Sequence, residues 1–288
     1  MTLARPPRAA SGERERLLRV EAAGPAREPA WVRLLPVVPF AVLVAAWLVG
    51  WQLTHPNLAT LPSLPTVLRT LGSLAASGEL WRNIVASLGR LGLAVAVGVV
   101  SGIALGFAAG LNRTVGRMIE PLATFFTAIS GIVWLPLAIV WFGIGTRTVV
   151  FIIWNSIFFI VFANTVLGVR SVPPVLDEAV RTLGGGRRHV IAQVIFPGAL
   201  PHVVSGLRAG LGFAWRALIA AEIIGATAGL GAMIFRGAEF IRSDVILAGN
   251  LVIGVIGLAI DLLVLVPLER RTVQRWGLVI PTGGGIRA

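Results

Sequence analysis

The stretch from Ser171 to Pro201, SVPPVLDEAVRTLGGGRRHVIAQVIFPGALP, separates two long apolar segments and is too polar to lie in lipid. Pro174 suits the first turn of a helix, where a missing backbone N–H has no cost. Asp177 follows where the helix dipole favours a negative charge, and the glycines from Gly184 favour termination. The pattern predicts a short helix that projects from a membrane protein.

One face of this predicted helix is apolar. Its members are Val175, Leu176, Ala179, Val180 and Leu183, which recur at helical spacing. The other face carries Asp177 and Arg181, which are spaced for an ion pair. Such a helix suits docking in the groove of a partner protein, and the alternative is a helix that lies on lipid headgroups.

The same residues carry a family resemblance. They are Glu178, Ala179, Val180, Gly184, Val194, Phe196 and Pro197. Their spacing resembles the "EAA loop" of bacterial ABC-importer permeases, with Val180 in place of Ala, Val194 in place of Ile and Phe196 in place of Leu. The resemblance implies that this loop couples the permease to a separate ATPase subunit, with Glu178, Ala179, Val180, Gly184 and Pro197 as the coupling residues.

The composition indicates a polytopic membrane protein. The chain has 288 residues, of which 56% are hydrophobic and 13% charged, and its mean hydropathy is +0.86. All 25 basic residues are Arg, so no phosphate-binding loop of the GxxxxGK[ST] type is possible. If ATP drives this protein, another chain must bind ATP and Mg²⁺, and we expect no cofactor in this one.

Six apolar segments have the length of membrane spans in an all-α fold. They run from Leu34 to Leu53 and, approximately, Leu91 to Gly110, Pro121 to Phe142, Thr148 to Val169, Val203 to Ala226, and Ile246 to Leu268. We expect disordered cytoplasmic tails at 1–30 and 276–288 around a permease domain at 31–275, with the coupling loop at 171–201. Arg residues are concentrated in the tails, in 112–120 and in this loop, which predicts that both termini face the cytoplasm of a bacterial inner membrane.

Four segments carry more detailed expectations. We expect a short amphipathic helix from Pro65 to Leu80, a basic link from Asn112 to Glu120, a kink at Pro136 and a Gly-rich outer loop from Gly225 to Asp244. A stripe of glycines recurs every four residues in the second span. It consists of Gly98, Gly102, Gly106 and Gly110, and it predicts close packing against another helix.

The resemblance extends over nearly the whole chain after Leu34. The motifs are Leu61-Pro62-Ser63, Ser87-Leu88-Gly89-Arg90, Trp134-Leu135-Pro136-Leu137, Trp141-Phe142-Gly143-Ile144-Gly145, Asn164-Thr165, Gly168-Val169-Arg170, Gly206-Leu207-Arg208, Ala221-Glu222 and Gly229-Leu230-Gly231. Together they resemble permeases for aliphatic sulfonates, taurine and nitrate. This implies a type I ABC importer with paired permeases, as a homodimer or with a second chain, two ATPases and an extracytoplasmic binding protein. Ser130 and Ile160 stand where this family usually has Pro, which leaves helix kinks there open.

Charges inside membrane spans usually face a cavity or a partner. Arg208, Arg216, Glu222 and Asp261 are such charges, and structural ion pairs are the alternative to a place on the solute pathway. We favour ion pairing or snorkelling for Arg208 and Asp261, and leave both alternatives open for Arg216 and Glu222.

Neutral side chains offer weaker candidates. Asn155, Asn164, Trp134, Trp154 and Trp215 suit either a pathway or packing between helices. The candidate pathway residues are Trp134, Asn164, Trp215, Arg216 and Glu222. No metal or nucleophile motif is present, so a membrane-embedded enzyme is weakly supported and no catalytic residue is assigned.

The sequence therefore predicts a permease that translocates a small, anionic solute. An ATP-independent channel is the alternative, because polar residues in six spans would serve either protein. Only the importer needs the loop that contains Glu178.

Overall fold

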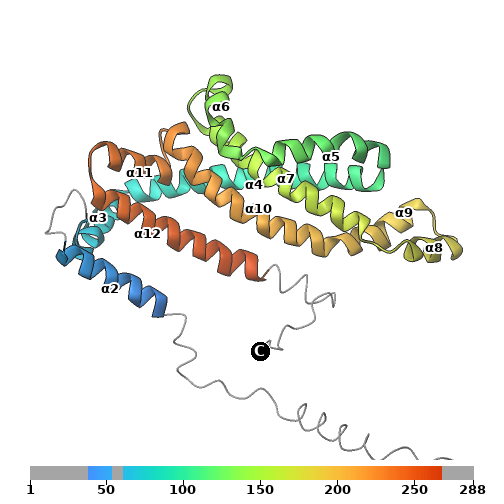
Figure 1. Ribbon diagram of the computed structural model, residues 1–288, viewed down its shortest axis with the longest axis horizontal. Coiled ribbons are helices and arrows are strands. Elements are labelled where there is room, and N and C mark those ends of the chain that lie inside the picture. The colour runs from blue at the N-terminus through green and yellow to red at the C-terminus, as the bar shows by residue number, and fades with distance from the viewer. Residues whose placement is uncertain (1–37, 54–60, 268–288) are drawn as a thin grey trace, which may run out of the picture. The chain divides into compact units, whose positions relative to one another are not determined.

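The computed structural model describes residues 38–53 and 61–267 (Figure 1), and every regular element in these ranges is a helix. The chain divides into two units, Met1–His55 and Pro56–Ala288. In the first unit, α2 (Val38–Leu53) is an apolar helix of 16 residues that matches the predicted first span. The remainder of that prediction, before Val38, and both predicted tails lie outside the described residues.

The second unit starts with α3 (Leu64–Ala76) and α4 (Glu79–Leu111), which Gly78 separates at a φ of +76°. The side chain of Ser63 caps α3 by accepting a hydrogen bond from the backbone N–H of Thr66. The predicted amphipathic helix is thus present and ends at Ala76. The helix that contains the predicted second span is longer than expected: α4 starts at Glu79, twelve residues before Leu91, and buries Arg90.

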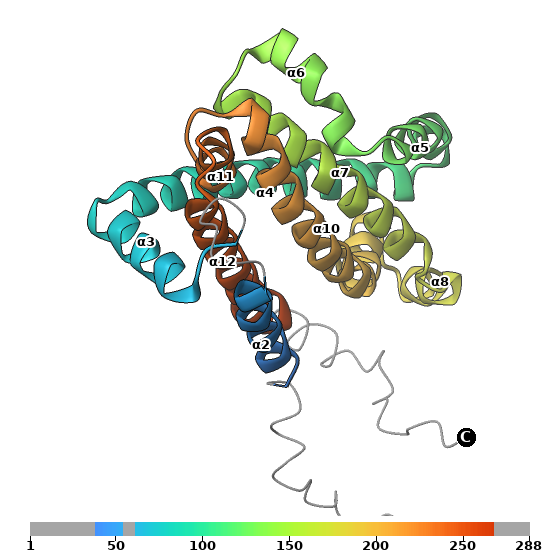
Figure 2. The ribbon, with the colours of Figure 1, turned by 60° about the vertical axis from the view of Figure 1, so that its left-hand side comes forward.

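The core of the second unit forms where α7 (Thr146–Arg170) packs against both α4 and α10 (Phe196–Gly225), as Figure 2 shows. The predicted glycine stripe of α4 faces α7. A Cβ added at Gly106 would lie 2.6 Å from the Cβ of Thr165, and one at Gly110 would lie 2.7 Å from that of Val169. Only glycine permits this approach, so the stripe is confirmed as a packing face and its partner is α7.

The predicted third span is broken. It consists of α5 (Arg113–Ala128), η2 (Gly131–Trp134) and α6 (Leu135–Phe142), with a bend of 88° between the two halves. The bend lies at the extended residues Ile129 and Ser130, so the predicted kink at Pro136 was wrong. Pro136 instead lies in the first turn of α6, where its missing N–H is harmless. The family's usual Pro is not needed at Ser130 for the helix to break.

The basic link predicted from Asn112 to Glu120 is helical, which corrects that prediction. The side chain of Asn112 caps α5 by accepting a hydrogen bond of 2.9 Å from the backbone N–H of Thr114. This local cap starts the helix at Arg113, eight residues before the expected span.

After α7 the chain forms α8 (Pro174–Thr182), α9 (Arg187–Val190) and the π-helix η3 (Ile191–Ile195), which leads directly into α10. The helical run from Arg187 to Gly225 contains 39 residues. The fifth span was predicted to begin near Val203, but α10 already starts at Phe196 and continues through Pro201.

The Gly-rich segment from Gly225 to Asp244, predicted as an outer loop, contains α11 (Leu230–Glu239). Its apolar residues Leu230 and Met233 are buried in a cluster with Leu74 and Leu80, which excludes a solvated loop. The chain then continues through α12 (Ser243–Ile260) and the π-helix η4 (Asp261–Leu265), which match the predicted sixth span within the described range.

Within the ranges that the structure describes, four helical runs are long and apolar enough to cross a membrane, and the bent pair of half-helices would make five. They are Glu79–Leu111, Thr146–Arg170, Arg187–Gly225 and Ser243–Leu265. The apolar part of α2, Ala41–Gln52, is shorter. The fold is thus that of a polytopic α-helical membrane protein, and the total of six spans stays a prediction because the described part of the first span is short.

Candidate functional site

A cavity of about 610 Å³ lies where the third span is broken. Residues of the α5 end, of the break, of α7 and of α10 line it. They are Phe126, Thr127, Ala128, Ile129, Ser130, Gly131, Ile132, Asn155, Ser156, Phe159, Ile160, Phe213, Arg216, Ala217 and Ala220. We call this space the break cavity. Its wall is largely apolar, so its few polar side chains determine what it can hold.

Two polar side chains of the break cavity are available to a ligand. Asn155 is only 7% exposed, yet its amide makes no hydrogen bond within the part of the chain that the structure describes. Arg216 makes no ion pair with any described residue, and its guanidinium lies 5.7 Å from the ring centroid of Phe213. An amide and a guanidinium together offer several N–H donors, which suits an oxyanion.

The hydroxyl groups nearby are mostly engaged with their own helices. The Ser156 hydroxyl donates to the carbonyl of Ile152 at 2.9 Å, and Thr127 donates to Ala123 at 2.7 Å. Ser156 also packs closely against Gly131, where a Cβ would lie 2.5 Å from its Oγ. The glycine therefore lets the break approach α7 closely. Since the hydroxyl groups are engaged, Asn155 and Arg216 are the strongest free hydrogen-bond donors in the break cavity.

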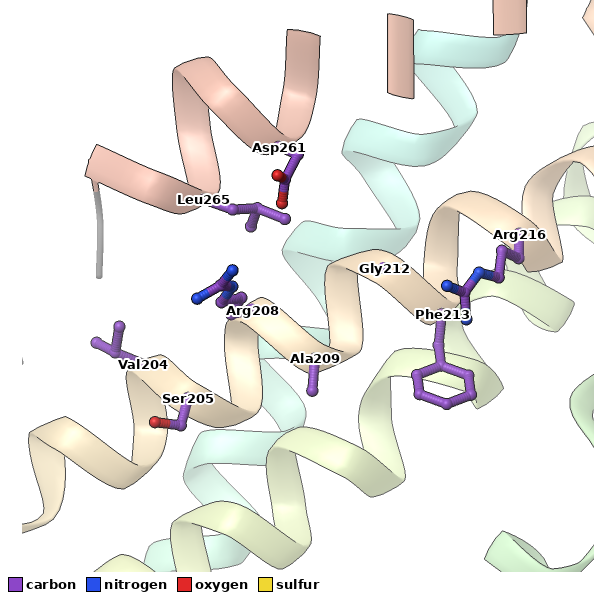
Figure 3. Close-up of a pocket in the computed structure, with 9 residues that line it drawn as sticks. All are labelled: Val204, Ser205, Arg208, Ala209, Gly212, Phe213, Arg216, Asp261 and Leu265. Carbon is purple, nitrogen blue, oxygen red and sulfur yellow. The ribbon is translucent and has the colours of Figure 1, made fainter. Parts of the chain in front are cut away.

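A second cavity, of about 400 Å³, lies between α10 and η4 (Figure 3). Its charged lining residues are Arg208, Arg216 and Asp261, and we call it the charged cavity. Arg216 lines both cavities. The guanidinium of one residue of α10 is thus accessible from two neighbouring spaces.

The other predicted pathway residues lie elsewhere. Trp134 is half-buried, packs against Phe126 at a centroid distance of 5.7 Å, and has an indole N–H without a partner in the described structure. Asn164 donates to the carbonyl of Ile160 in its own helix at 2.9 Å. Trp215 packs against α12 beside Gly257. None of the three lines the break cavity or the charged cavity.

Glu222 is completely buried and fully bonded. It accepts hydrogen bonds from Ser87 Oγ at 2.7 Å, from Arg90 Nη1 at 2.7 Å and from the backbone N–H of Gly231 at 3.1 Å. Asn83 adds to this group by accepting from the N–H of Gly229 at 2.9 Å. The four side chains, Asn83, Ser87, Arg90 and Glu222, form what we call the buried polar cluster.

The buried polar cluster fastens α4 to the turn between α10 and α11. Arg90 also donates to the carbonyl of Ala228 at 2.6 Å, and Ser87 accepts from the N–H of Leu230 at 2.9 Å. Of the two alternatives left open for Glu222, the geometry favours the structural ion pair. Because the second span was expected to begin near Leu91, Arg90 was expected outside it, and its partnership with Glu222 was missed. Asn83, Ser87 and Arg90 share one helix face, which was the available signal.

The predicted helix of the coupling loop is present as α8. Its end is held by two hydrogen bonds, from the N–H of Gly184 to Arg181 and from the N–H of Gly185 to Val180, both 2.9 Å. Gly184 has a φ of +83°, as expected for this type of helix end. Asp177 and Arg181 form the expected ion pair at 2.6 Å, and this hydrogen bond raises the pKa of Arg181.

The predicted coupling residues differ in exposure. Glu178 and Ala179 are exposed, while Val180, Gly184 and Pro197 lie from half-buried to exposed around them. Val175 and Leu183 of the apolar face are 63% and 88% exposed. This unit therefore leaves an apolar strip and an adjacent carboxylate of α8 uncovered.

Comparisons with known proteins agree with this architecture. Residues 98–271 match a family described as the binding-protein-dependent transport system inner membrane component. The chain is 38% identical over 236 residues to the taurine transport system permease protein TauC of Escherichia coli (strain K12), covering 79% of this chain and 85% of that protein.

Two further relatives have other solutes in their names. The putative aliphatic sulfonates transport permease protein SsuC of Bacillus subtilis (strain 168) is 32% identical, over 85% of this chain and 87% of that protein. The bicarbonate transport system permease protein CmpB of Synechococcus elongatus is 33% identical, over 69% of each chain.

Solved structures share the fold. An amino acid ABC transporter with histidines has a TM-score of 0.58 at 19% identity, with coverage of 70% of this chain and 97% of that one. The inward-facing MetNI methionine ABC transporter has a TM-score of 0.53 at 19% identity, over 66% and 95%. Both support the type I ABC importer permease fold.

Family, relatives and fold agree on a multi-pass component of the inner membrane that transports rather than catalyses. The chain therefore belongs to the inner membrane component family of binding-protein-dependent transport systems, and it is a permease subunit of an ABC importer.

Proposed function

We propose that this permease translocates a small solute with an anionic group, and that Arg216 and Asn155 contact that group. Taurine, aliphatic sulfonates and bicarbonate, which appear in the names of the relatives, all carry a negatively charged oxyanion. The observation that carries the proposal is the break cavity, which holds a guanidinium without an ion pair and an unbonded buried amide among the described residues. A charge in a membrane span that lacks a structural partner is a candidate for solute contact.

The broken span strengthens this assignment. Transporters often place their solute site where a membrane helix is interrupted, because helix ends expose backbone groups that lack intrahelical partners. Here Ile129 and Ser130, at the break, line the same cavity as Arg216 of α10. Of the residues predicted from the sequence, we retain Arg216 for the pathway and assign Trp134, Asn164, Trp215 and Glu222, none of which lines either cavity, to packing.

We propose further that α8 docks on an ATPase subunit, with Glu178, Ala179, Val180, Gly184 and Pro197 as coupling residues. An exposed apolar strip beside a carboxylate suits a groove in a partner protein. The helical run from Arg187 to Gly225 begins just after α8 and contains Arg216, so one continuous helical run connects the end of the coupling loop to the break cavity. Because helix packing has discrete alternatives, a displacement of α8 can switch the accessible side of the cavity.

The assembly follows from the same assignment. We infer a pair of permease subunits, most simply two copies of this chain, with two ATPases that bind ATP and Mg²⁺ and a binding protein on the outer side. The Arg distribution supports a cytoplasmic position for α8 and for both chain termini. With that orientation, the buried polar cluster lies toward the outer side, since α10 runs from α8 to it.

The test is ATP-driven uptake by the complete importer in proteoliposomes, with taurine and ethanesulfonate as labelled probes. Replacing Arg216 with Gln removes a charge-assisted hydrogen bond, so uptake should fall about tenfold or more while basal ATP hydrolysis stays unchanged. Arg82→Gln is the matched control, because Arg82 is an exposed residue of α4 outside both cavities.

Three results would count against the proposal. Unchanged uptake by the Arg216→Gln importer would remove the guanidinium from the pathway. Uptake of neither probe by the wild-type importer would exclude this solute class. Uptake without ATP would indicate the channel that the sequence analysis kept as an alternative.

A further inference from the structure

The charged cavity contains a carboxylate that an anion pathway does not require. Asp261 begins η4, and its side chain points from that helix into the space above α10, where Arg208 points back toward it (Figure 3). Asp261 is half-buried and makes no hydrogen bond or ion pair with any residue of the described ranges. Arg208, by contrast, has an interaction of its own.

An unpaired carboxylate at this position has a physical cost. A charged side chain within a membrane span is unfavourable unless a partner or a function compensates for it. Asp261 would also repel an anionic solute that approaches Arg216 through the charged cavity, because like charges repel strongly where water is scarce. The carboxylate becomes favourable if the solute brings a positive charge as well as a negative one.

The arrangement of charges fits such a solute. Arg216 offers a guanidinium without an ion pair among the described residues, and Asp261 offers a carboxylate in the same cavity from the facing helix. The cavity volume of about 400 Å³ accommodates a small organic molecule. Arg216 also faces the break cavity, so an acid group held there could extend its other end toward Asp261.

We propose that Asp261 binds the ammonium group of a zwitterionic solute whose acid group binds to Arg216. The permease would then prefer aminosulfonates or related amino acids to solutes that carry only the acid group. This inference rests on the proposed function and adds a residue that sets specificity within it. Arg208, which already has an interaction of its own, is not one of the two residues that bind the solute in this proposal.

The experiment measures binding to the permease itself, because a binding protein would impose its own selectivity on uptake. The purified permease–ATPase complex in nanodiscs, without the binding protein, is titrated with taurine and with ethanesulfonate, which has the same carbon chain but no amine. We expect the wild-type complex to bind taurine about tenfold more tightly, as one charge-assisted contact would produce.

Asp261→Asn should abolish this preference by weakening taurine binding without weakening ethanesulfonate binding. Glu239→Gln is the matched control, since Glu239 is an exposed carboxylate of α11 outside both cavities and should leave the preference intact. Basal ATP hydrolysis by each complex verifies that it is folded and assembled. Arg216→Gln should weaken the binding of both probes.

Several outcomes would overturn the inference. They are a wild-type complex that does not bind taurine, one that binds both probes equally, and a preference that survives Asp261→Asn. Equal loss of both probes in Asp261→Asn would show that Asp261 balances the charge of the arginines instead. The proposed function fails separately, if Arg216→Gln leaves the binding of both probes unchanged.

Discussion

Replacement of Glu222 with Gln should strongly destabilise the permease without acting on the solute directly. The carboxylate of Glu222 accepts every hydrogen bond that it makes, from Ser87, Arg90 and the N–H of Gly231. Gln has nearly the same shape but presents an NH₂ group where one carboxylate oxygen was. A donor would then face another donor in a site from which water is excluded.

The magnitude follows from burial. The side chain of Arg90 is 9% exposed and that of Glu222 is 0% exposed, so removal of the negative charge leaves a guanidinium buried without its partner. Breaking such a pair costs about 3–5 kcal/mol. Because Arg90 keeps its bond to the carbonyl of Ala228, we expect the lower end, about 3 kcal/mol.

Thermal unfolding of the purified wild-type complex and of the Glu222→Gln complex, compared under the same conditions, measures this cost. Glu120→Gln is the control, because Glu120 pairs with Arg170 where both side chains are more than a third exposed, and it should cost less than about 1 kcal/mol. A combined Arg90→Met, Glu222→Met variant should cost less than the sum of the single changes, since neither charge is left alone.

Two results would refute this reasoning. A Glu222→Gln complex as stable as wild type would show that the buried polar cluster does not hold α4 to the turn before α11. A stable complex with lost solute uptake would return Glu222 to the pathway, the alternative that its geometry disfavours.

Other substitutions test packing and the helix end. Gly106→Ala places a methyl group 2.6 Å from Thr165 and should cost about 1–3 kcal/mol in thermal unfolding, whereas Gly92→Ala, with no atom within 4 Å, should be neutral or slightly stabilising; the reverse order would contradict the packing of α4 on α7. Gly184→Ala, at a φ of +83°, should cost about 1 kcal/mol and reduce recovery of the ATPase, while Gly186→Ala should have no effect on recovery. Equal recovery from both variants would show that the end of α8 does not position the docking surface.

The sequence predicted α8 correctly because its determinants are local. Pro174 lies in its first turn, Asp177 and Arg181 pair one helical turn apart, and Gly184 adopts the left-handed backbone that ends it. Each of these signals acts within a few residues, so no knowledge of the tertiary structure is required.

The break in the third span and the helix α11 could not be predicted in this way. Nothing local at Ile129 and Ser130 forbids a helix, and the approach of Gly131 to Ser156 of α7 depends on the tertiary fold. The candidate site shares this dependence, because Asn155 and Arg216 are far apart in sequence and meet only where the span breaks. Glycines suggested a loop before α12, but burial of Leu230 outweighed their low helix propensity.

Recovery of the ATPase with the solubilised permease from its native membrane tests most directly whether α8 couples this chain to an ATPase. An ATPase subunit should co-purify with the wild-type permease. It should not co-purify with Glu178→Arg, because the substitution reverses the exposed charge beside the apolar strip. Glu239→Arg, which reverses an exposed charge on α11, should retain it. Equal recovery of the ATPase with wild type and Glu178→Arg would contradict docking through α8.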